Sequence, residues 1–310
     1  MAAIELTGLT KRFDDVVAVD DLDLTIEDGE IFGFLGPNGA GKSTTIDILL
    51  DFIRPTEGTA TVVGHDAQAE SLAVRQRIGV LPDAYHTYDR LTGRQHVEFV
   101  VESKATEAET DVDALLERVG ILEAADRKSG GYSKGMRQRL VLAMALVGDP
   151  DLLILDEPST GLDPNGAREM REIIQQENER GTTVFFSSHI MEQVEAICDR
   201  VAIINRGRLV AVDTVDGLRG STEIGTTLHV STAGVDEAAL ETVRGFDGVA
   251  GVSVDGERLR VTLSGGGPLK FEVLKALDGA GVSIEDFEIE ESSLEDLFVR
   301  YTTDEQEVRA

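Results

Sequence analysis

The chain has 310 residues, of which 41% are hydrophobic, and it carries a formal net charge of -29. That length predicts about two domains of ordinary size, at roughly 100–200 residues each. Its longest apolar stretches, such as "VLAMALV", fall far short of the about 20 residues of a membrane-spanning helix, and "MAAIELTGL" lacks the regions of a secretory signal. We therefore expect a cytoplasmic chain that reaches a membrane only through a partner. The single cysteine, Cys198, excludes an internal disulfide and a multi-cysteine metal site.

The negative charge is spread over the whole chain. Residues 221–310 contain 19 acidic and 7 basic residues, which leaves 39 acidic and 22 basic residues for residues 1–220. Only 7 of the 29 basic residues are lysine. An evenly acidic surface that is poor in lysine suggests a salt-loving, halophilic host. The same charge argues against a general nucleic-acid binder, which needs a basic footprint.

The first part of the chain predicts strands with few helices between them. Residues 3–9 and 16–26 alternate apolar and polar side chains, as half-buried strands do. "EIFGFLG", residues 30–36, predicts a buried strand that ends in a glycine-rich turn, and "KSTTIDILLDFI", residues 42–53, predicts the helix after it. "TATVVG" and "GVLP" predict two further strands, and residues 93–120 are mostly helical.

The next segment alternates helices with buried strands. A helix from Ser133 to Val147 leads into the continuous apolar run "LLILD", which is typical of a central parallel strand. Helices from about Pro164 and Ile190 flank the strand "TTVFFSS", and "RVAIINRG" predicts one more strand. Strands that alternate with helices predict a parallel sheet covered on both faces.

The pattern changes after a linker at residues 217–225. Beyond it we expect a strand, a helix, two strands, a helix and a strand, at residues 226–231, 235–244, 249–254, 258–264, 269–279 and 282–290. This βαββαβ order predicts an α+β ferredoxin-like domain, followed by a short helix near "SLEDLFVRY". No catalytic constellation is visible in it, so it could dimerise, regulate or cap the preceding sheet.

The segment "GPNGAGKST", residues 36–44, fits the pattern G-x-x-x-x-G-K-[ST] between a predicted strand and a predicted helix. Its glycines let backbone N–H groups close around phosphates, and the helix N-terminus favours the anion. Lys42 reaches the β and γ phosphates, and Ser43 offers an oxygen to Mg²⁺. We therefore expect a nucleoside-triphosphate site formed by Gly36, Pro37, Asn38, Gly39, Ala40, Gly41, Lys42, Ser43 and Thr44.

A second motif, "LLILDEP", complements this loop. Asp156 ends the predicted buried strand and can hold Mg²⁺ through water, while Glu157 points at the γ phosphate. Alone, the motif could be a strand end followed by a solvated Asp-Glu pair. Together with the glycine-rich loop it predicts a site for phosphate chemistry.

These motifs, with "YSKGMRQRL" before the second and "STGLD" after it, resemble the ATP-binding cassette family. In that family a signature segment contacts the γ phosphate of ATP held by another subunit, and it corresponds here to Ser133, Lys134, Gly135 and Met136. Ser133 and Gly135 match the family pattern, whereas Lys134 and Met136 depart from its usual Gly and Gln. Read alone, the segment could be only the start of an amphipathic helix. The resemblance implies a dimer of cassettes, made of two copies or of this chain and a related one.

The resemblance assigns three more positions. Phe13 stands where an aromatic ring stacks on adenine, although it could instead be a core aromatic. His189, at the end of a predicted buried strand, matches a switch histidine that touches the γ phosphate, although a lone histidine is more often structural. Asp163 matches a loop that crosses to the other subunit, and it is also a typical N-cap before Pro164.

The stretch "GVLPDAYHTYDRLTG", residues 79–93, corresponds in the family to a loop in which a Gln usually contacts Mg²⁺ or the attacking water. Asp83 occupies that position here, and an ionised carboxylate cannot offer the N–H donors of Gln. It could tighten Mg²⁺ binding, keep the loop withdrawn until Mg·ATP arrives, or be a bystander. Four residues stand where the family meets its membrane subunit, which predicts either a docking surface or local packing: Tyr85, His86, Tyr88 and Leu91.

The resemblance implies both a fold and an activity. The fold is an α/β P-loop NTPase cassette over residues 1–218, with a mixed sheet core, an antiparallel β subdomain and a helical subdomain at about 84–150, followed by the ferredoxin-like domain at 225–310. The activity is ATP hydrolysis, with Glu157, Lys42 and His189 as catalytic residues. ATP and Mg²⁺ are the expected cofactors, and the expected metal ligands are Ser43, Asp156 and Asp83.

The work that the ATPase drives is open to alternatives. The end of the chain is similar to cassettes of the daunorubicin-resistance type, which favours an exporter subunit at the inner face of the cell membrane, bound to a separate integral membrane permease. An importer ATPase and a soluble cassette protein acting on ribosomes or DNA are the alternatives. Translation-type members usually carry two cassettes, and repair-type members insert a long coiled coil between the two motifs, whereas only residues 45–155 separate them here.

Overall fold

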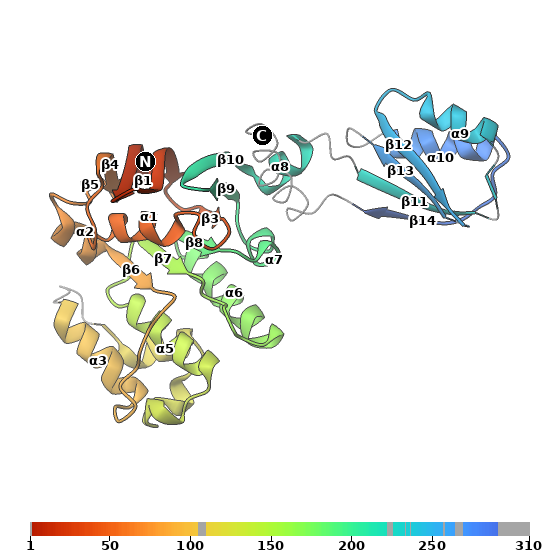
Figure 1. The fold of residues 1–310 in the computed structure, drawn as a ribbon. Helices are drawn as coiled ribbons and strands as arrows, with labels where there is room; N and C mark the ends of the chain where they lie inside the picture. The colour runs from red at the N-terminus through yellow and green to blue at the C-terminus, as the bar shows by residue number, and fades with distance from the viewer. Residues whose placement is uncertain are drawn as a thin grey trace. The chain divides into compact units, whose positions relative to one another are not determined.

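The computed structural model describes residues 2–104, 110–221, 226–232, 234–235, 237–256, 258–263 and 269–290. The chain divides into two compact units, Met1–Val212 and Asp213–Ala310, and each is described by itself (Figure 1). None of the helices in the described part of the chain is long and apolar enough to cross a membrane.

An antiparallel sheet opens the first unit. Its strand order is β2-β1-β4-β5, with bounds β1 (Ala2–Phe13), β2 (Val16–Glu27), β4 (Glu57–Val62) and β5 (His65–Asp66). The alternation of apolar and polar residues in β1 and β2 buries every second side chain, as Leu22, Leu24 and Ile26 show. The strand predictions for residues 3–9 and 16–26 are therefore correct, although each strand is longer than its pattern.

A six-stranded mixed sheet forms the core of this unit. Its order is β10-β9-β3-β8-β7-β6, with bounds β3 (Ile31–Leu35), β6 (Ile78–Leu81), β7 (Leu152–Asp156), β8 (Thr183–Ser188), β9 (Arg200–Asn205) and β10 (Arg208–Thr214). The neighbours from β6 to β9 pair in parallel. Parallel strands buried on both faces are apolar throughout, and every residue of β3, β7 and β8 is buried. Their carboxyl ends meet at one edge of the sheet.

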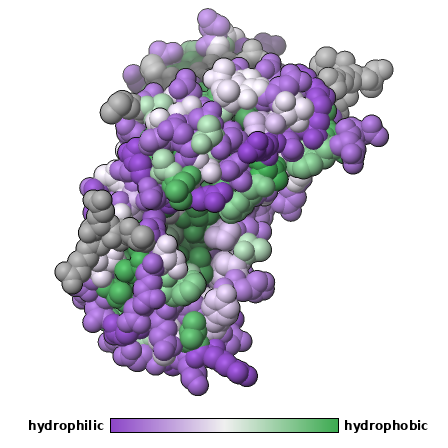
Figure 2. All heavy atoms as spheres, turned by 90° about the vertical axis from the view of Figure 1, so that its left-hand side faces the viewer, coloured by the Kyte–Doolittle hydropathy of each residue, from purple (hydrophilic) through white to green (hydrophobic). Residues whose placement is uncertain are grey.

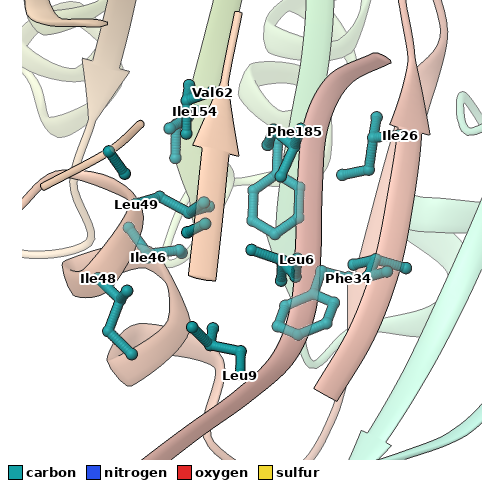
Figure 3. Close-up of a cluster of buried hydrophobic side chains, with 14 of the residues drawn as sticks. Leu6, Leu9, Ile26, Phe34, Ile46, Ile48, Leu49, Val62, Ile154 and Phe185 are labelled. Atoms are coloured by element: carbon teal, nitrogen blue, oxygen red, sulfur yellow. The ribbon is translucent and has the colours of Figure 1, made fainter. Parts of the chain in front are cut away.

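The helix α1 (Lys42–Leu49) lies between the two sheets (Figure 3). Ile46, Ile48 and Leu49 of this helix belong to one buried cluster with side chains from both sheets, among them Leu6, Leu9, Phe34, Ile154 and Phe185. Phe34 and Phe185 have ring centroids 5.3 Å apart. This packing fixes the position of α1 relative to β3, with the loop of residues 36–41 between them.

The opposite face of the core sheet is covered by other helices. A Cβ at Gly33, between Phe32 and Phe34, would collide with Val194 of α7 (Met191–Glu195), so glycine is required there for close helix packing. The helix α6 (Pro164–Glu179) also contacts β8. Cys198 is buried beside Gly33, and burial raises the pKa of its thiol, so it acts as a small hydrophobe.

A helical region is inserted between β6 and β7. It contains α3 (Gly93–Lys104), α4 (Val112–Arg118) and α5 (Lys134–Ala145), with 3₁₀ turns at Leu122–Ala124 and Ser129–Gly131. Arg118 of α4 pairs with the buried Glu177 of α6 and with Asp149, whose carboxylate lies 2.9 Å away. The inserted helices are therefore tied to the core of the unit by a buried ion pair.

The second unit begins with α8 (Val215–Ser221) and contains a four-stranded antiparallel sheet. The strand order is β12-β13-β11-β14, with bounds β11 (Thr226–Thr232), β12 (Val249–Asp255), β13 (Arg258–Leu263) and β14 (Ile284–Glu290). The helices α9 (Glu237–Arg244) and α10 (Leu269–Gly279) supply Leu240, Val243 and Val273 to a separate buried core. The βαββαβ order and this pairing are those of a ferredoxin-like fold, so the predicted fold class is confirmed for both parts.

The structure also contains elements that the sequence did not predict. These are β5, β10, α2 (Ser71–Arg77) and α8. In α2 only Val74 is buried, and β10 has no fully buried residue, so neither has a clear apolar period. β9 and β10 are joined by a two-residue turn, Arg206 and Gly207, with φ of 49° and 82°, which is typical of a hairpin. The short helix predicted near "SLEDLFVRY" lies outside the described residues.

Candidate functional site

The loop at residues 36–44 joins β3 to α1 at the carboxyl edge of the core sheet. Gly39 and Gly41 have φ of 79° and 112°, which side chains other than glycine rarely adopt. A Cβ at Gly41 would lie 2.5 Å from the Ala18 carbonyl oxygen, and one at Gly36 would lie 2.6 Å from the Ile204 carbonyl oxygen. Glycine is therefore required where the loop meets the neighbouring backbone, and the start of α1 points its N–H groups at the loop.

Lys42 is the buried cation of this loop. Its ammonium donates to the Gly36 carbonyl at 2.7 Å and lies 3.8 Å from Oε1 of Glu157. Burial lowers the pKa of Lys42, although Glu157, Asp156 and Asp83 oppose that shift by their charges. A buried ammonium close to three carboxylates is ready to receive a polyanion such as a triphosphate.

Glu157 stands directly after β7 in a left-handed conformation, with φ of 51°. Its Oε1 lies 2.7 Å from Nδ1 of His189, and its Oε2 accepts from the hydroxyl groups of Thr160 at 3.2 Å and Ser188 at 3.4 Å. Because a carboxylate only accepts, His189 donates from Nδ1. The predicted catalytic residues Glu157, His189 and Lys42 are therefore brought together.

Asp156 ends β7 with a largely buried side chain. Its Oδ1 has no hydrogen-bond partner among the residues that the structure describes. Burial raises the pKa of Asp156, and the charges of Asp83 and Glu157 add to that effect. A buried, unpaired carboxylate oxygen is costly unless a cation or water meets it, so this donor fits a hard cation such as Mg²⁺.

A cavity of about 370 Å³ lies over these residues. Its lining comes from the end of β1, the start of β2, the phosphate loop, Asp83 and the two acidic residues at the end of β7. These residues are Phe13, Val16, Val17, Ala18, Pro37, Asn38, Gly39, Gly41, Lys42, Ser43, Thr44, Asp83, Asp156 and Glu157. Phe13 is 45% exposed at its rim, with the Lys11 ammonium 4.8 Å from the ring centroid. An exposed ring is poorly suited to a core role and free to stack on a base.

Asp83 follows β6 and lines two hollows. It belongs to the cavity described above and to an adjoining groove of about 580 Å³, which also has Tyr85, His86, Lys134 and Arg137 in its walls. Its charge acts on both Lys42 and Asp156. Asp83 therefore lines both the cavity and the groove.

The signature segment, residues 133–136, and Asp163 do not line the cavity. Ser133 is the N-cap of α5 and accepts from Met136 N at 3.2 Å, and Asp163 is the N-cap of α6 and accepts from Gly166 N at 2.7 Å. Both side chains therefore satisfy backbone groups at helix starts. They stay away from the Lys42 of their own chain.

Several residues around the site were not anticipated. Val16, Val17 and Ala18 line the cavity, but their alternating pattern predicted only a strand. Gly207 N donates to the Ala40 carbonyl at 2.8 Å and braces the phosphate loop from the β9–β10 turn. Thr160 could have been suspected as a hydroxyl three residues after Glu157, within reach of its carboxylate in a tight turn.

A phosphate loop on a buried lysine, beside an Asp-Glu pair at the carboxyl edge of a parallel sheet, defines the class of P-loop nucleoside triphosphatases. Comparison with known families matches residues 19–160 to the ABC transporter family and residues 214–302 to the C-terminal domain of ATP-binding proteins similar to DrrA1-3.

Curated relatives agree with that match. The ABC transporter ATP-binding protein NatA of Bacillus subtilis is 40% identical over 69% of this chain and 91% of its own length. The daunorubicin/doxorubicin resistance ATP-binding protein DrrA of Streptomyces peucetius is 40% identical over 71% of this chain and 67% of its own. A solved ATP-binding subunit of an ABC transporter, 26% identical, superposes with a TM-score of 0.63 over 70% of this chain and 92% of that one. The chain belongs to the ABC transporter ATP-binding family, and it is an ATPase of that family.

Proposed function

We propose that the chain is the ATP-hydrolysing subunit of an exporter, which dimerises when it binds ATP and drives a separate membrane-spanning partner. The carboxylate of Glu157, held between His189 and Lys42 at the inner end of the cavity, is the observation that carries the catalytic part of this proposal. The directional part is supported by the match of residues 214–302 to a domain found in DrrA-type proteins.

Nucleotide binding follows from the lining of the cavity. The backbone N–H groups of residues 36–44 and the Lys42 ammonium receive the phosphates, while the Phe13 ring stacks on the base. Ser43, Asp156 and Asp83 would hold Mg²⁺, because hydroxyl and carboxylate oxygens are the donors that this cation prefers. The cation would supply charge neutralisation at the β and γ phosphates.

Glu157 is placed to act on the attacking water. Its carboxylate orients that water and accepts its proton, and His189 would stabilise charge on the transferred phosphoryl group as an Nε2–H donor, with its ring protonated on both nitrogens. Lys42 adds a fixed positive charge on the other side. Since the protein supplies only positioning and charge, the strained turn at Glu157 serves to aim the carboxylate.

A second subunit would complete the site. Ser133, Lys134, Gly135, Met136 and Asp163 lie outside the cavity of their own chain, and in this proposal they serve ATP held by another subunit. We take the dimer to be formed by two copies, or by this chain and a related cassette.

Besides the second cassette, the partner of this chain would be an integral membrane permease. We propose no nucleic-acid partner. Relatives of this chain carry names that describe daunorubicin resistance, bacitracin transport and Nod factor export. The groove beside Asp83 and the exposed Tyr88 form the docking surface in this proposal, with the chain held at the cytoplasmic face of the membrane. Figure 2 shows hydrophobic residues among largely hydrophilic ones on the face that it presents.

The loop that carries Tyr88 is well supported for such a role. Tyr88 N donates to Nε2 of the buried His96 at 2.9 Å, and the Ser129 hydroxyl donates to the Tyr88 carbonyl at 3.0 Å. Nδ1 of His96 lies 2.7 Å from the Thr92 carbonyl, which fixes its tautomer with Nε2 as acceptor. These hydrogen bonds hold the backbone of Tyr88 in place, while the residue itself is 69% exposed and available to a partner.

The variant Glu157→Gln tests the catalytic part. It removes the base but preserves the shape and the oxygen acceptor of the side chain, so ATP turnover should fall by at least about a hundredfold while ATP binding is retained. Steady-state phosphate release measures the first effect, and equilibrium binding of ATP measures the second. An unchanged hydrolysis rate would refute the assignment of Glu157.

A further inference from the structure

The signature segment and the turn after Glu157 pack against each other within one chain. The side chain of Lys134 lies over Gly161, so that a Cβ at Gly161 would overlap its ammonium and lie 3.3 Å from its Cε and 3.7 Å from its Cδ. Gly161 has φ of 70°. The absence of a side chain at residue 161 therefore leaves the space that Lys134 fills.

Two neighbouring contacts extend this packing. Gln138 of α5 is buried and its Nε2 donates to the Pro158 carbonyl. A Cβ at Gly135 would lie 3.6 Å from Leu162 Cδ2, so the start of α5 rests on the same turn. Residues 158–162 are thus held from one side by three positions of α5, and they cannot shift independently of its first turn.

The same turn contacts the catalytic carboxylate. The Thr160 hydroxyl donates to Oε2 of Glu157 at 3.2 Å, and Thr160 N donates to the Glu157 carbonyl at 3.1 Å. Gly161, beneath Lys134, follows Thr160 directly in the chain. The residue that donates to Glu157 is therefore the direct neighbour of the glycine that Lys134 covers.

We infer that Lys134 and Thr160 are positioning residues that join the signature segment to Glu157 of the same subunit. The inference rests on the proposed dimer, in which that segment contacts ATP in the site of the other subunit. ATP bound in one site then aligns the catalytic carboxylate of the other site through Lys134, Gly161 and Thr160. Lys134 would accordingly act within its own chain, in addition to any contact with the ATP of its partner.

Mixed dimers separate the two roles of Lys134. A subunit carrying Glu157→Gln binds ATP without hydrolysing it, so a dimer of this subunit with wild type has a single hydrolysing site, made of the wild-type Glu157 and the signature segment of the Glu157→Gln subunit. The other site keeps its ATP in contact with the wild-type signature segment. Placing Lys134→Ala in the subunit that keeps Glu157 probes the effect within the chain. Placing it in the Glu157→Gln subunit probes only the contact across the dimer.

The inference predicts that Lys134→Ala in the Glu157-bearing subunit lowers kcat of the mixed dimer by about fivefold to tenfold, with KM for ATP changed by no more than about twofold. Thr160→Val in that same subunit should give the same kcat loss, and Thr160→Ser, which keeps the donor, should restore the rate. A lowered kcat with rescue by serine is not expected of a residue that only stabilises the fold.

Three results would decide against it. If Lys134→Ala has no effect in the Glu157-bearing subunit, or if its effect is confined to the other subunit, the residue is only a contact across the dimer and the inference is wrong. If Thr160→Val leaves kcat unchanged in the Glu157-bearing subunit, the path to Glu157 is wrong. If the reference dimer itself neither forms nor hydrolyses ATP, the proposed function fails first. The melting temperature of each variant, measured alongside, shows that the compared subunits are folded.

Discussion

Asp83 and Asp156 place two carboxylates in the lining of one cavity. Both carboxylates face the same cavity, and the charge of Asp83 adds to the burial that raises the pKa of Asp156. Two like charges close together are held apart by repulsion until a cation neutralises them. A Gln at position 83 would lack that repulsion and would also lack the charge that attracts Mg²⁺.

Replacing Asp83 by Gln should therefore lower the affinity of the nucleotide site for Mg²⁺. We expect the Mg²⁺ concentration for half-maximal ATP binding to rise by about threefold to tenfold, because one anionic ligand is lost. Titrating Mg²⁺ into the protein with a fluorescent ATP analogue measures this directly. Asp89→Asn is the matched control, since Asp89 lines the adjoining groove but not the cavity. Equal Mg²⁺ curves for Asp83→Gln and wild type would make Asp83 a bystander.

At the scale of elements, the inserted helices depend on one buried charge. Glu177, at the end of α6, has a side chain that is only 1% exposed and pairs with Arg118 of α4 and with Arg180. Removing one partner of such a pair leaves a buried charge with fewer hydrogen bonds. The helices α3 to α5 carry the signature segment, so this pair also fixes where that segment stands.

Arg118→Met should accordingly lower the free energy of unfolding by about 2–3 kcal/mol, since Arg180 continues to meet Glu177. Urea denaturation followed by circular dichroism gives the value. Arg168→Met serves as control, because Arg168 forms an exposed pair with Glu172 on α6 and its loss should cost at most about 0.5 kcal/mol. Equal losses of unfolding free energy for the two substitutions would show that the Arg118–Glu177 pair stabilises the fold no more than an exposed pair does.

The elements also show how far sequence reasoning reaches. The parallel strands were predictable because β7 and β8 contain the continuous apolar runs "LLIL" and "VFF", and α5 and α6 because Ser133 and Asp163 are typical N-caps. The phosphate loop was predictable because its spacing is fixed by phosphate geometry. β10 and α2 were missed, since their stability comes from tertiary pairing and not from their own pattern.

Contacts between distant residues were the part of the site that the sequence could not supply. Val16 and Ala18 line the cavity because β2 pairs with β1 beside the phosphate loop. Gly207, which is distant from Ala40 in the sequence, donates a hydrogen bond to its carbonyl. The space at Gly161 that Lys134 fills is likewise invisible in the motif "STGLD". Such contacts depend on the packing of several elements, which no local pattern encodes.

For the whole molecule, the net charge of -29 is the dominant property. Carboxylates outnumber cations in both halves of the sequence, so self-repulsion opposes the compact state at low ionic strength. Salt at molar concentration reduces the screening length to about 3 Å and removes most of that repulsion. We therefore expect the folded state to gain stability as the salt concentration rises.

The melting temperature should rise when KCl is increased from about 0.05 M to 2 M or more, by about 10 °C or more for a chain of this charge. Differential scanning fluorimetry across a KCl series is sufficient, with a near-neutral P-loop protein of similar size as control. A melting temperature that stays level from low to multimolar KCl would remove the idea of salt adaptation, and it would leave the catalytic account unchanged.

The most direct test of the central claim is the mass of the Glu157→Gln variant in solution with and without nucleotide. The proposed function predicts a monomer without nucleotide or with ADP, and a stable dimer with ATP, because the signature segment of each subunit closes on ATP that cannot be hydrolysed. Size-exclusion chromatography with light scattering distinguishes 33.4 kDa from twice that mass. A Glu157→Gln protein that binds ATP and yet stays monomeric at every concentration would contradict the account.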